Sequence, residues 1–135
     1  MHGTPSANQA LAAKKVNFTT GAGYALYLNT SRQVVGILAD GTNSITVTST
    51  AVSAGVDHTA TLVRDGGTVR LIVDGTEVDS DIDNTGDLSN AEELRFCRLS
   101  GDGTSYSEET WVGAAVFPEA LSASDAGSLD TELAA

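Results

Sequence analysis

Three carboxylates at alternate positions, Glu77, Asp79 and Asp81, are the residues of this sequence whose spacing most directly suggests chemistry. Alternate residues of a β-strand point to the same face, so one regular strand would place all three side chains side by side. Carboxylates placed in this way can act as acid and base, ligate a metal ion, or form a solvated acidic surface. The face of the sheet that they occupy decides among these three roles.

The segment that carries these carboxylates has the pattern of a β-hairpin. Asp74-Gly75 lies between two runs of branched aliphatic residues, and a two-residue type I′ turn needs positive φ at both of its central positions, which Asp tolerates and Gly accepts freely. This turn predicts a register across the two strands: Val73 faces Thr76, Ile72 faces Glu77, Leu71 faces Val78, and Arg70 faces Asp79.

In this register one face of the hairpin is apolar and the other is polar. The apolar face contains Val69, Leu71, Val73 and Val78. Glu77 and Asp79 lie on the other face, where Arg70 opposite Asp79 forms a cross-strand charge pair worth about 0.2–1 kcal/mol. The register therefore predicts a solvated acidic surface, because carboxyls that remain in water lack the desolvation that most strongly shifts a pKa.

Composition narrows the classes of function. The chain has 135 residues, a net charge of −11 and two lysines, Lys14 and Lys15, so no basic stripe is present to bind nucleic acid or an anionic membrane. Cys97 is the single cysteine, which excludes an intramolecular disulfide. No apolar run approaches the about 20 residues of a membrane helix, and residues 1–15 lack the order of a signal peptide. We expect a soluble protein made in a bacterial cytoplasm.

The strand pattern predicts one all-β domain. Short runs rich in β-branched residues alternate with Gly-, Asp- and Asn-containing turns, which is typical of an antiparallel β-sandwich or jelly roll. We expect residues 1–15 to form an N-terminal arm or loop and residues 16–135 to form a single domain. Ser122 and Asp125 resemble a capping box and predict a short C-terminal helical turn. The expected strands lie at residues 24–28, 34–38, 44–48, 58–64, 68–73, 76–78, 93–99 and 109–117.

Three stretches in order resemble the laminin-G-like, concanavalin A-like lectin and glucanase family. They are GYALYL (23–28), DHTATLVRDGGTVRLIVDGTEV (57–78) and ETWVGAAVFPEALSASDAGSL (109–129). The resemblance covers about residues 21–130 and implies a jelly-roll sandwich. The family usually opens with two further strands, so either residues 7–20 form a reduced version of them or a sheet edge is left open. An open edge favours an oligomer, because a neighbouring chain can cover it.

The glucanase branch of this family uses alternate carboxylates on one strand, and EVDSD (77–81) partly resembles that pattern. A retaining glycosidase holds its two carboxyls about 5–5.5 Å apart, whereas the Cα atoms of residues i and i+4 on a strand lie about 13 Å apart. Asp81 stands where a longer glutamate belongs. We therefore expect no enzymatic activity.

Calcium is the one cofactor with candidate ligands, since it takes 6–8 oxygen ligands. Asp102 and Glu108 follow or flank a glycine-rich loop, and a second acidic cluster spans residues 79–87. The resemblance alone would place acidic residues at positions 114 and 115, where this chain has alanines. We expect both acidic segments to be solvated loops, and no other cofactor.

The remaining candidates are single side chains. His58 is read as a packing or turn residue, and no Ser-His-Asp set is expected because the Gly-x-Ser-x-Gly motif is absent. Tyr24, Tyr27 and Tyr106 are the candidate sugar-stacking residues.

These observations predict a non-enzymatic structural or adhesive module on a larger assembly. The expected assembly is a bacteriophage virion, in which the protein would be a capsid decoration or minor tail protein, would contact capsid or tail proteins, and would form a homo-oligomer on the virion surface. The alternative is a glycan-binding lectin module, calcium-dependent or not, which would act outside the cell on surface sugars.

Overall fold

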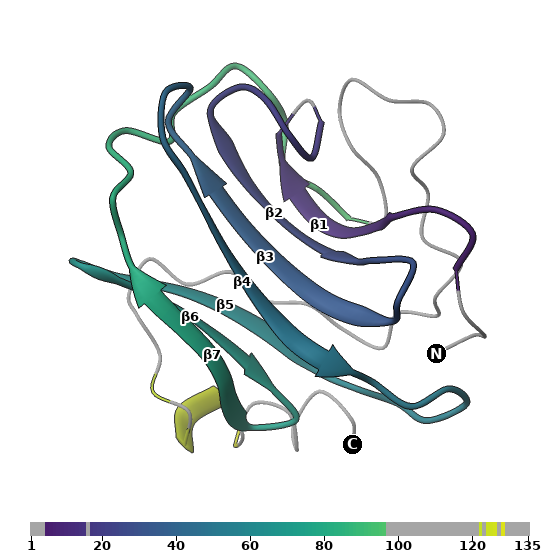
Figure 1. Ribbon diagram of the computed structural model, residues 1–135. Coiled ribbons are helices and arrows are strands. Elements are labelled where there is room, and N and C mark those ends of the chain that lie inside the picture. The colour runs from purple at the N-terminus through teal and green to yellow at the C-terminus, as the bar shows by residue number, and fades with distance from the viewer. Residues whose placement is uncertain (1–4, 16, 97–121, 123, 127, 129–135) are drawn as a thin grey trace.

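The computed structural model describes residues 5–15, 17–96, 122, 124–126 and 128. Its strands form two antiparallel sheets that pack against each other, which confirms the predicted all-β sandwich (Figure 1). The five-stranded sheet has the order β4-β3-β2-β1-β8, and the three-stranded sheet has the order β5-β6-β7. The strands are β1 (Gln9–Lys14), β2 (Gly23–Leu28), β3 (Gln33–Ala39), β4 (Ser44–Ala51), β5 (Ala60–Asp65), β6 (Thr68–Val73), β7 (Thr76–Ile82) and β8 (Arg95–Phe96).

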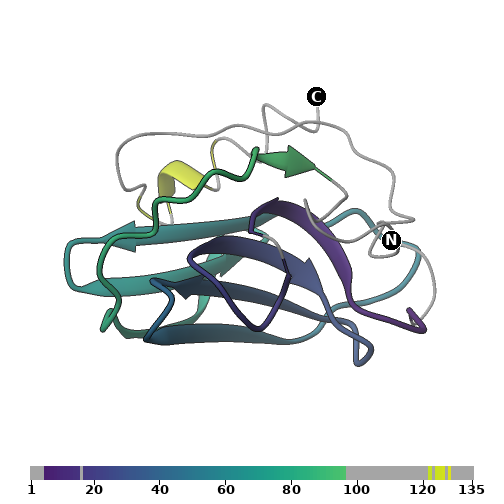
Figure 2. The ribbon, with the colours of Figure 1, turned by 90° about the horizontal axis from the view of Figure 1, so that it is seen from above.

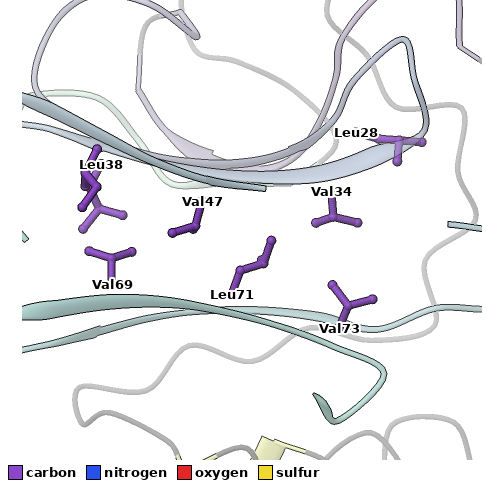
Figure 3. Packing of buried hydrophobic residues seen from close by; sticks show 8 residues of the cluster. Leu28, Val34, Leu38, Val47, Val69, Leu71 and Val73 are labelled. Carbon is purple, nitrogen blue, oxygen red and sulfur yellow. The ribbon is translucent and has the colours of Figure 1, made fainter. Parts of the chain in front are cut away.

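The space between the sheets is filled by aliphatic side chains from both layers (Figure 3). Alternate residues of each strand point inward, so the runs of Val, Leu and Ile in the sequence place every second side chain in this core. Each fully buried Val or Leu contributes about 1.5–3 kcal/mol. The buried members are Leu28, Val34, Leu38, Ile45 and Val47 from the five-stranded sheet and Val69, Leu71 and Val73 from the three-stranded sheet.

The absence of a side chain at Gly36 lets the two sheets approach closely. A Cβ atom at this position of β3 would lie 2.4 Å from Cδ1 of Leu62 on β5. Leu62 therefore packs directly against the backbone of the opposite sheet, which helps to fill a core that contains few aromatic residues.

The outer faces of both sheets are also partly buried. On the five-stranded sheet, Ala10, Ala13, Ala25 and Ile37 form a second cluster with Phe18 and Tyr27 packed against it. On the three-stranded sheet, Val63 and Ile72 contact Ala126 of the short C-terminal helix, which lies on the side away from the other sheet (Figure 1).

Ser122 and Asp125, which resemble a capping box in the sequence, are hydrogen-bonded to each other at the start of that helix. The backbone N–H of Asp125 donates to Oγ of Ser122 (3.1 Å), and the Ser122 hydroxyl donates to the Asp125 carboxylate (2.7 Å). Residues 124–126 and 128 are helical, so the predicted short C-terminal turn is confirmed.

The prediction that residues 1–15 form an arm or loop is wrong for residues 9–14, which form β1. This strand pairs with β2 on one side and with β8 on the other. Its small alanines gave no strand pattern in the sequence, but Ala10 and Ala13 are completely buried, because small residues fit where neighbouring segments approach closely. The sequence allowed two alternatives for residues 7–20, a reduced version of the two opening strands or an open sheet edge. The structure contains the first, as the single strand β1.

After β7 the chain crosses from the three-stranded sheet to the five-stranded sheet. Figures 1 and 2 show this segment in green as it leaves β7 and runs over to β8, beside β1. We call residues 83–92 the crossover. The predicted strand at 93–99 is observed as β8, whose described part is Arg95–Phe96, and the predicted strand at 109–117 lies outside the described residues.

The start of β2 has no room for a side chain. A Cβ atom on Gly23 would lie 2.1 Å from the backbone oxygen of Lys14, and the φ of Gly23 is 129°. We predict that Gly23→Ala lowers the free energy of unfolding by about 1–3 kcal/mol or more, because the left-handed backbone strain and the clash add.

Urea unfolding would measure this loss. Gly67→Ala is the matched control, because no atom lies within 4 Å of the added methyl group. Equal stability of the Gly23→Ala variant and the wild type would contradict the geometry described for β2.

Candidate functional site

A β-bulge prevents the three carboxylates of β7 from sharing one face. The predicted register holds through the pair Ile72–Glu77 and then shifts by one residue, so Leu71 lies opposite Asp79 rather than Val78. The prediction that Val78 faces the core is therefore wrong, and its side chain is 41% exposed. A bulge inserts an extra residue on one strand, which reverses the faces of all later residues relative to the regular alternation.

Because of the shift, Glu77 and Asp81 point to opposite faces of the three-stranded sheet. Glu77 lies opposite Ile72, which packs against the outer helix, whereas Asp81 lies opposite Val69, which belongs to the core between the sheets. Residues directly opposite each other share a face. These two carboxylates therefore do not form the close pair that a retaining glycosidase needs.

Asp79 links the two sheets instead of pairing with Arg70. One of its carboxylate oxygens, Oδ2, accepts the backbone N–H of Thr48 on β4 at 2.7 Å. The predicted charge pair between Arg70 and Asp79 is wrong. The Arg70 guanidinium lies 3.5 Å from the Asp65 carboxylate and 3.9 Å from that of Glu77.

In the acidic cluster at residues 79–87, Asp83 and two backbone carbonyls bind Arg64. Arg64 on β5 donates from Nε to Asp83 at 2.5 Å and from Nη2 to the carbonyls of Thr85 and Gly86. Burial opposes ionisation of Asp83, but the Thr85 hydroxyl and the Arg64 guanidinium outweigh it and hold the pKa of this carboxyl below its ordinary value. The Ser89 hydroxyl and N–H likewise lower the pKa of Asp87.

Asp40 fixes the crossover to the turn between β3 and β4. Its Oδ1 accepts the backbone N–H groups of Asn43 (2.7 Å) and Thr42 (2.8 Å), and its Oδ2 accepts the N–H of Gly86 (2.8 Å). The N–H groups of Asn43, Gly86 and Thr42 together hold the pKa of Asp40 well below its ordinary value, because they bind the charged form.

Asn90 fixes the far end of the crossover to β1 and β2. Its amide nitrogen donates to the backbone oxygens of Lys14 (2.9 Å) and Ala22 (2.8 Å), and its Oδ1 accepts from the Lys14 ammonium (3.1 Å) and from the N–H of Glu92 (2.9 Å). The Lys14 ammonium also donates to the backbone oxygens of Asn90 and Glu92. Lys14 is therefore a structural cation.

Lys15 is completely buried. Its ammonium donates to the backbone oxygen of Thr20 at 2.7 Å and to that of Gly21. Desolvation by this burial lowers the pKa of Lys15. Both lysines of the chain thus bind main-chain carbonyls near the ends of β1 and β2.

Ser53, His58 and Asp74 form a hydrogen-bonded set that sequence reasoning missed. His58 Nδ1 lies 2.7 Å from Asp74 Oδ2, and His58 Nε2 lies 3.2 Å from Ser53 Oγ. The other Asp74 oxygen accepts the N–H of Thr59 at 3.0 Å. The order of these contacts is that of a Ser-His-Asp triad. No sequence motif marked it, since the three residues meet only when the loop at residues 52–59 folds onto the hairpin turn.

His58 Nε2 has a second neighbour besides the Ser53 hydroxyl. His58 Nε2 also lies 3.1 Å from the backbone oxygen of Ser53, which accepts a further hydrogen bond from Arg32 Nη2 at 2.7 Å. A ring nitrogen that donates to this carbonyl cannot at the same time accept the Ser53 hydroxyl proton. The set holds the loop between β4 and β5 against the turn between β6 and β7.

The candidate sugar-stacking tyrosines do not form one platform. Tyr24 packs against the core between the sheets, whereas Tyr27 packs on the outer face of the five-stranded sheet against Phe18, with ring centroids 4.4 Å apart. Burial raises the pKa of Tyr27. The third candidate, Tyr106, lies outside the described residues.

The calcium candidates Asp102 and Glu108 also lie outside the described residues, as do Cys97 and the alanines at 114 and 115. Within the ranges that the structure describes, no three His, Cys, Asp or Glu side chains are grouped so that they could hold a metal ion. The same part of the chain contains no helix with the length and apolar character needed to cross a bilayer.

The low pKa of Asp40 makes its contribution to stability depend on pH. A folded-state pKa below the ordinary aspartate value of about 3.9 means that the ionised carboxylate stabilises the fold above that pH and that this stabilisation is lost as the pH falls below it. We predict that Asp40→Asn destabilises the protein at pH 7 and that its effect shrinks progressively below about pH 4.

Urea unfolding at several pH values would test this, with the exposed Asp57→Asn as control. A destabilisation by Asp40→Asn that stays constant from pH 7 to pH 3 would contradict the prediction.

Asn90 satisfies several half-buried polar groups at once. We predict that Asn90→Ala lowers the free energy of unfolding by about 2–4 kcal/mol, because it leaves the carbonyls of Lys14 and Ala22 and the Glu92 N–H without this partner. Thermal and urea unfolding would measure the loss against Asn84→Ala, an exposed asparagine of the same crossover. A loss no larger than that of the control would show that the anchor is dispensable.

Comparison with known proteins gives one structural likeness to report. No protein-family model matches this chain, and no curated protein matches it. The chain is similar to the 2.1 Å crystal structure of an S-layer domain-containing protein (residues 221–444) from Clostridium thermocellum ATCC 27405, with a TM-score of 0.41 and 18% identity. The alignment covers 96% of this chain and 65% of that one, so this chain spans less than two thirds of its length.

Proposed function

We propose that this protein is a non-enzymatic structural or adhesive module of a larger assembly, and that the assembly is a bacteriophage virion. In it the protein would be a capsid decoration or minor tail protein of the laminin-G-like class. The non-enzymatic part of this proposal is supported by what the carboxylates bind. Asp40, Asp79 and Asp83 each accept backbone N–H groups that hold a turn or a strand in place.

These contacts produce a scaffold rather than a reactive centre. The crossover is fixed by Asp40, by Arg64 and by the Lys14 ammonium at Asn90, so it is held by charge-assisted hydrogen bonds, which are stronger than neutral ones. A net charge of −11 keeps such a module soluble before assembly. Both properties suit a protein that is made free and then displayed on a particle.

Strand β7 offers the surface that supports contact with a partner. It lies at the edge of the three-stranded sheet, and two aliphatic side chains on it are exposed, Val78 at 41% and Ile82 at 76%. Edge strands are the usual sites at which a sheet meets another chain. We propose that Ile82 is buried when the protein binds its particle or a second copy.

Binding to particles that lack the protein tests this function. The particles are those of the phage whose capsid or tail genes flank the coding gene. We expect the wild-type protein to sediment with them and Ile82→Ser to bind about tenfold more weakly, since loss of one buried aliphatic side chain costs on the order of 1.4 kcal/mol or more. Thr46→Ala, an exposed substitution on β4, is the matched control.

Two outcomes would reject the proposal in different ways. A protein that remains monomeric in analytical ultracentrifugation and does not bind such particles is not a virion component. Specific signals on a glycan array, compared with and without a chelator, would favour the lectin alternative instead.

A further inference from the structure

His58 has three neighbouring hydrogen-bonding groups, and the role of each depends on how many protons the ring carries. Its Nδ1 faces a carboxylate oxygen of Asp74 at 2.7 Å, and its Nε2 faces both the backbone oxygen of Ser53 at 3.1 Å and the Ser53 hydroxyl at 3.2 Å. The His58 side chain is 9% exposed, so water replaces few of these contacts. The proton count of the ring therefore decides which of the contacts are hydrogen bonds.

With both ring protons present, every contact of His58 is favourable. Nδ1–H donates to Asp74 and Nε2–H donates to the Ser53 carbonyl. A neutral ring can donate from only one nitrogen. If it kept the Nε2 proton, the lone pair of Nδ1 would face the Asp74 carboxylate at 2.7 Å, which is repulsive, so the neutral ring keeps the proton on Nδ1.

In that neutral form Nε2 has lost its proton, and the Ser53 hydroxyl supplies the proton of a new hydrogen bond to it. The bare Nε2 becomes an acceptor, and the hydroxyl proton of Ser53 can rotate toward it across 3.2 Å. The backbone oxygen of Ser53 keeps its hydrogen bond from Arg32 Nη2 at 2.7 Å. Both states thus leave the two ring nitrogens and the Ser53 carbonyl with partners.

We propose that Ser53, His58 and Asp74 form a proton-linked latch, in which Ser53 binds His58 through its carbonyl when the ring is charged and through its hydroxyl when the ring is neutral. The latch joins the loop at residues 52–59 to the hairpin turn at Asp74-Gly75. Val56, 52% exposed, lies in that loop. Protonation therefore changes how one end of the sandwich is held.

The charges around the latch come from three elements of the described part of the chain. Asp74 belongs to the β6–β7 turn, Arg32 to the β2–β3 turn, and the exposed Asp57 precedes His58 in its own loop. Arg32 reaches His58 through the Ser53 carbonyl that both groups share. Its guanidinium keeps that carbonyl satisfied in both states, so the Ser53 hydroxyl is the group whose role changes.

The test is the cost of Ser53→Ala at two pH values, a lower one at which NMR of the wild-type ring nitrogens shows the ring charged and a higher one at which it shows the ring neutral. At the lower pH the charged ring uses the carbonyl, which the substitution keeps, so stability changes little. At the higher pH the neutral ring loses its donor, and we expect the unfolding equilibrium constant to rise about fivefold more than at the lower pH, as one net hydrogen bond implies. Ser80→Ala, an exposed serine on β7, is the control.

The pH-dependent part of the Ser53→Ala effect must vanish in a His58→Asn background, where no ring proton can be lost. NMR of the ring nitrogens in the wild-type protein gives a second, substitution-free readout, with the neutral ring expected to carry its proton on Nδ1. An equal Ser53→Ala effect at both pH values, a pH dependence that persists in His58→Asn, or a neutral ring protonated on Nε2 would each overturn the latch.

Discussion

The crossing of the chain from one sheet to the other after β7 is the constraint on which the rest of the structure depends. The crossover is a polar segment, and its backbone groups must find partners as it passes the end of the sandwich. Arg64 and Asp40 bind its first half, and Lys14 and Ala22 bind Asn90 at its end. Because these anchors belong to both sheets, the segment that brings β8 to β1 also fixes the position of one sheet relative to the other.

Three of the acidic residues, Asp40, Asp79 and Asp83, have a structural role in this architecture. A carboxylate in a tight turn accepts backbone N–H groups that no strand partner can satisfy, as Asp40 and Asp83 do. Asp79 applies the same chemistry between layers, where it binds an N–H of edge strand β4. Asp40, Asp79 and Asp83 are therefore bound to the protein's own backbone.

The Ser53–His58–Asp74 set reproduces the connectivity of a catalytic triad and joins a loop to the hairpin turn at Asp74-Gly75. The carbonyl of Ser53 lies as close to His58 as its hydroxyl does, so His58 Nε2 can either donate to the carbonyl or accept from the hydroxyl. This competition supports a role in holding the loop.

The sequence by itself determined the local features of this protein. The alternation of aliphatic residues predicted β2 to β6, Asp74-Gly75 predicted the turn with positive φ at both positions, and Ser122 with Asp125 predicted the helix start. Each of these depends on residues close together in the chain, so its signal is present in a short window. Candidate sites at Tyr106, Asp102 and Glu108 stay predictions.

Only the tertiary structure decided the features that depend on distant partners. The bulge at Val78 moved Asp79 to the side of Thr48, because the neighbouring sheet there offers an N–H that needs an acceptor. The alanines of β1 form a strand because they pair with β2 on one side and β8 on the other. His58 contacts Ser53 and Asp74 because the loop and the turn lie at the same end of the sandwich. Such contacts leave no periodic pattern in the sequence, since the energy that selects them comes from groups far away along the chain.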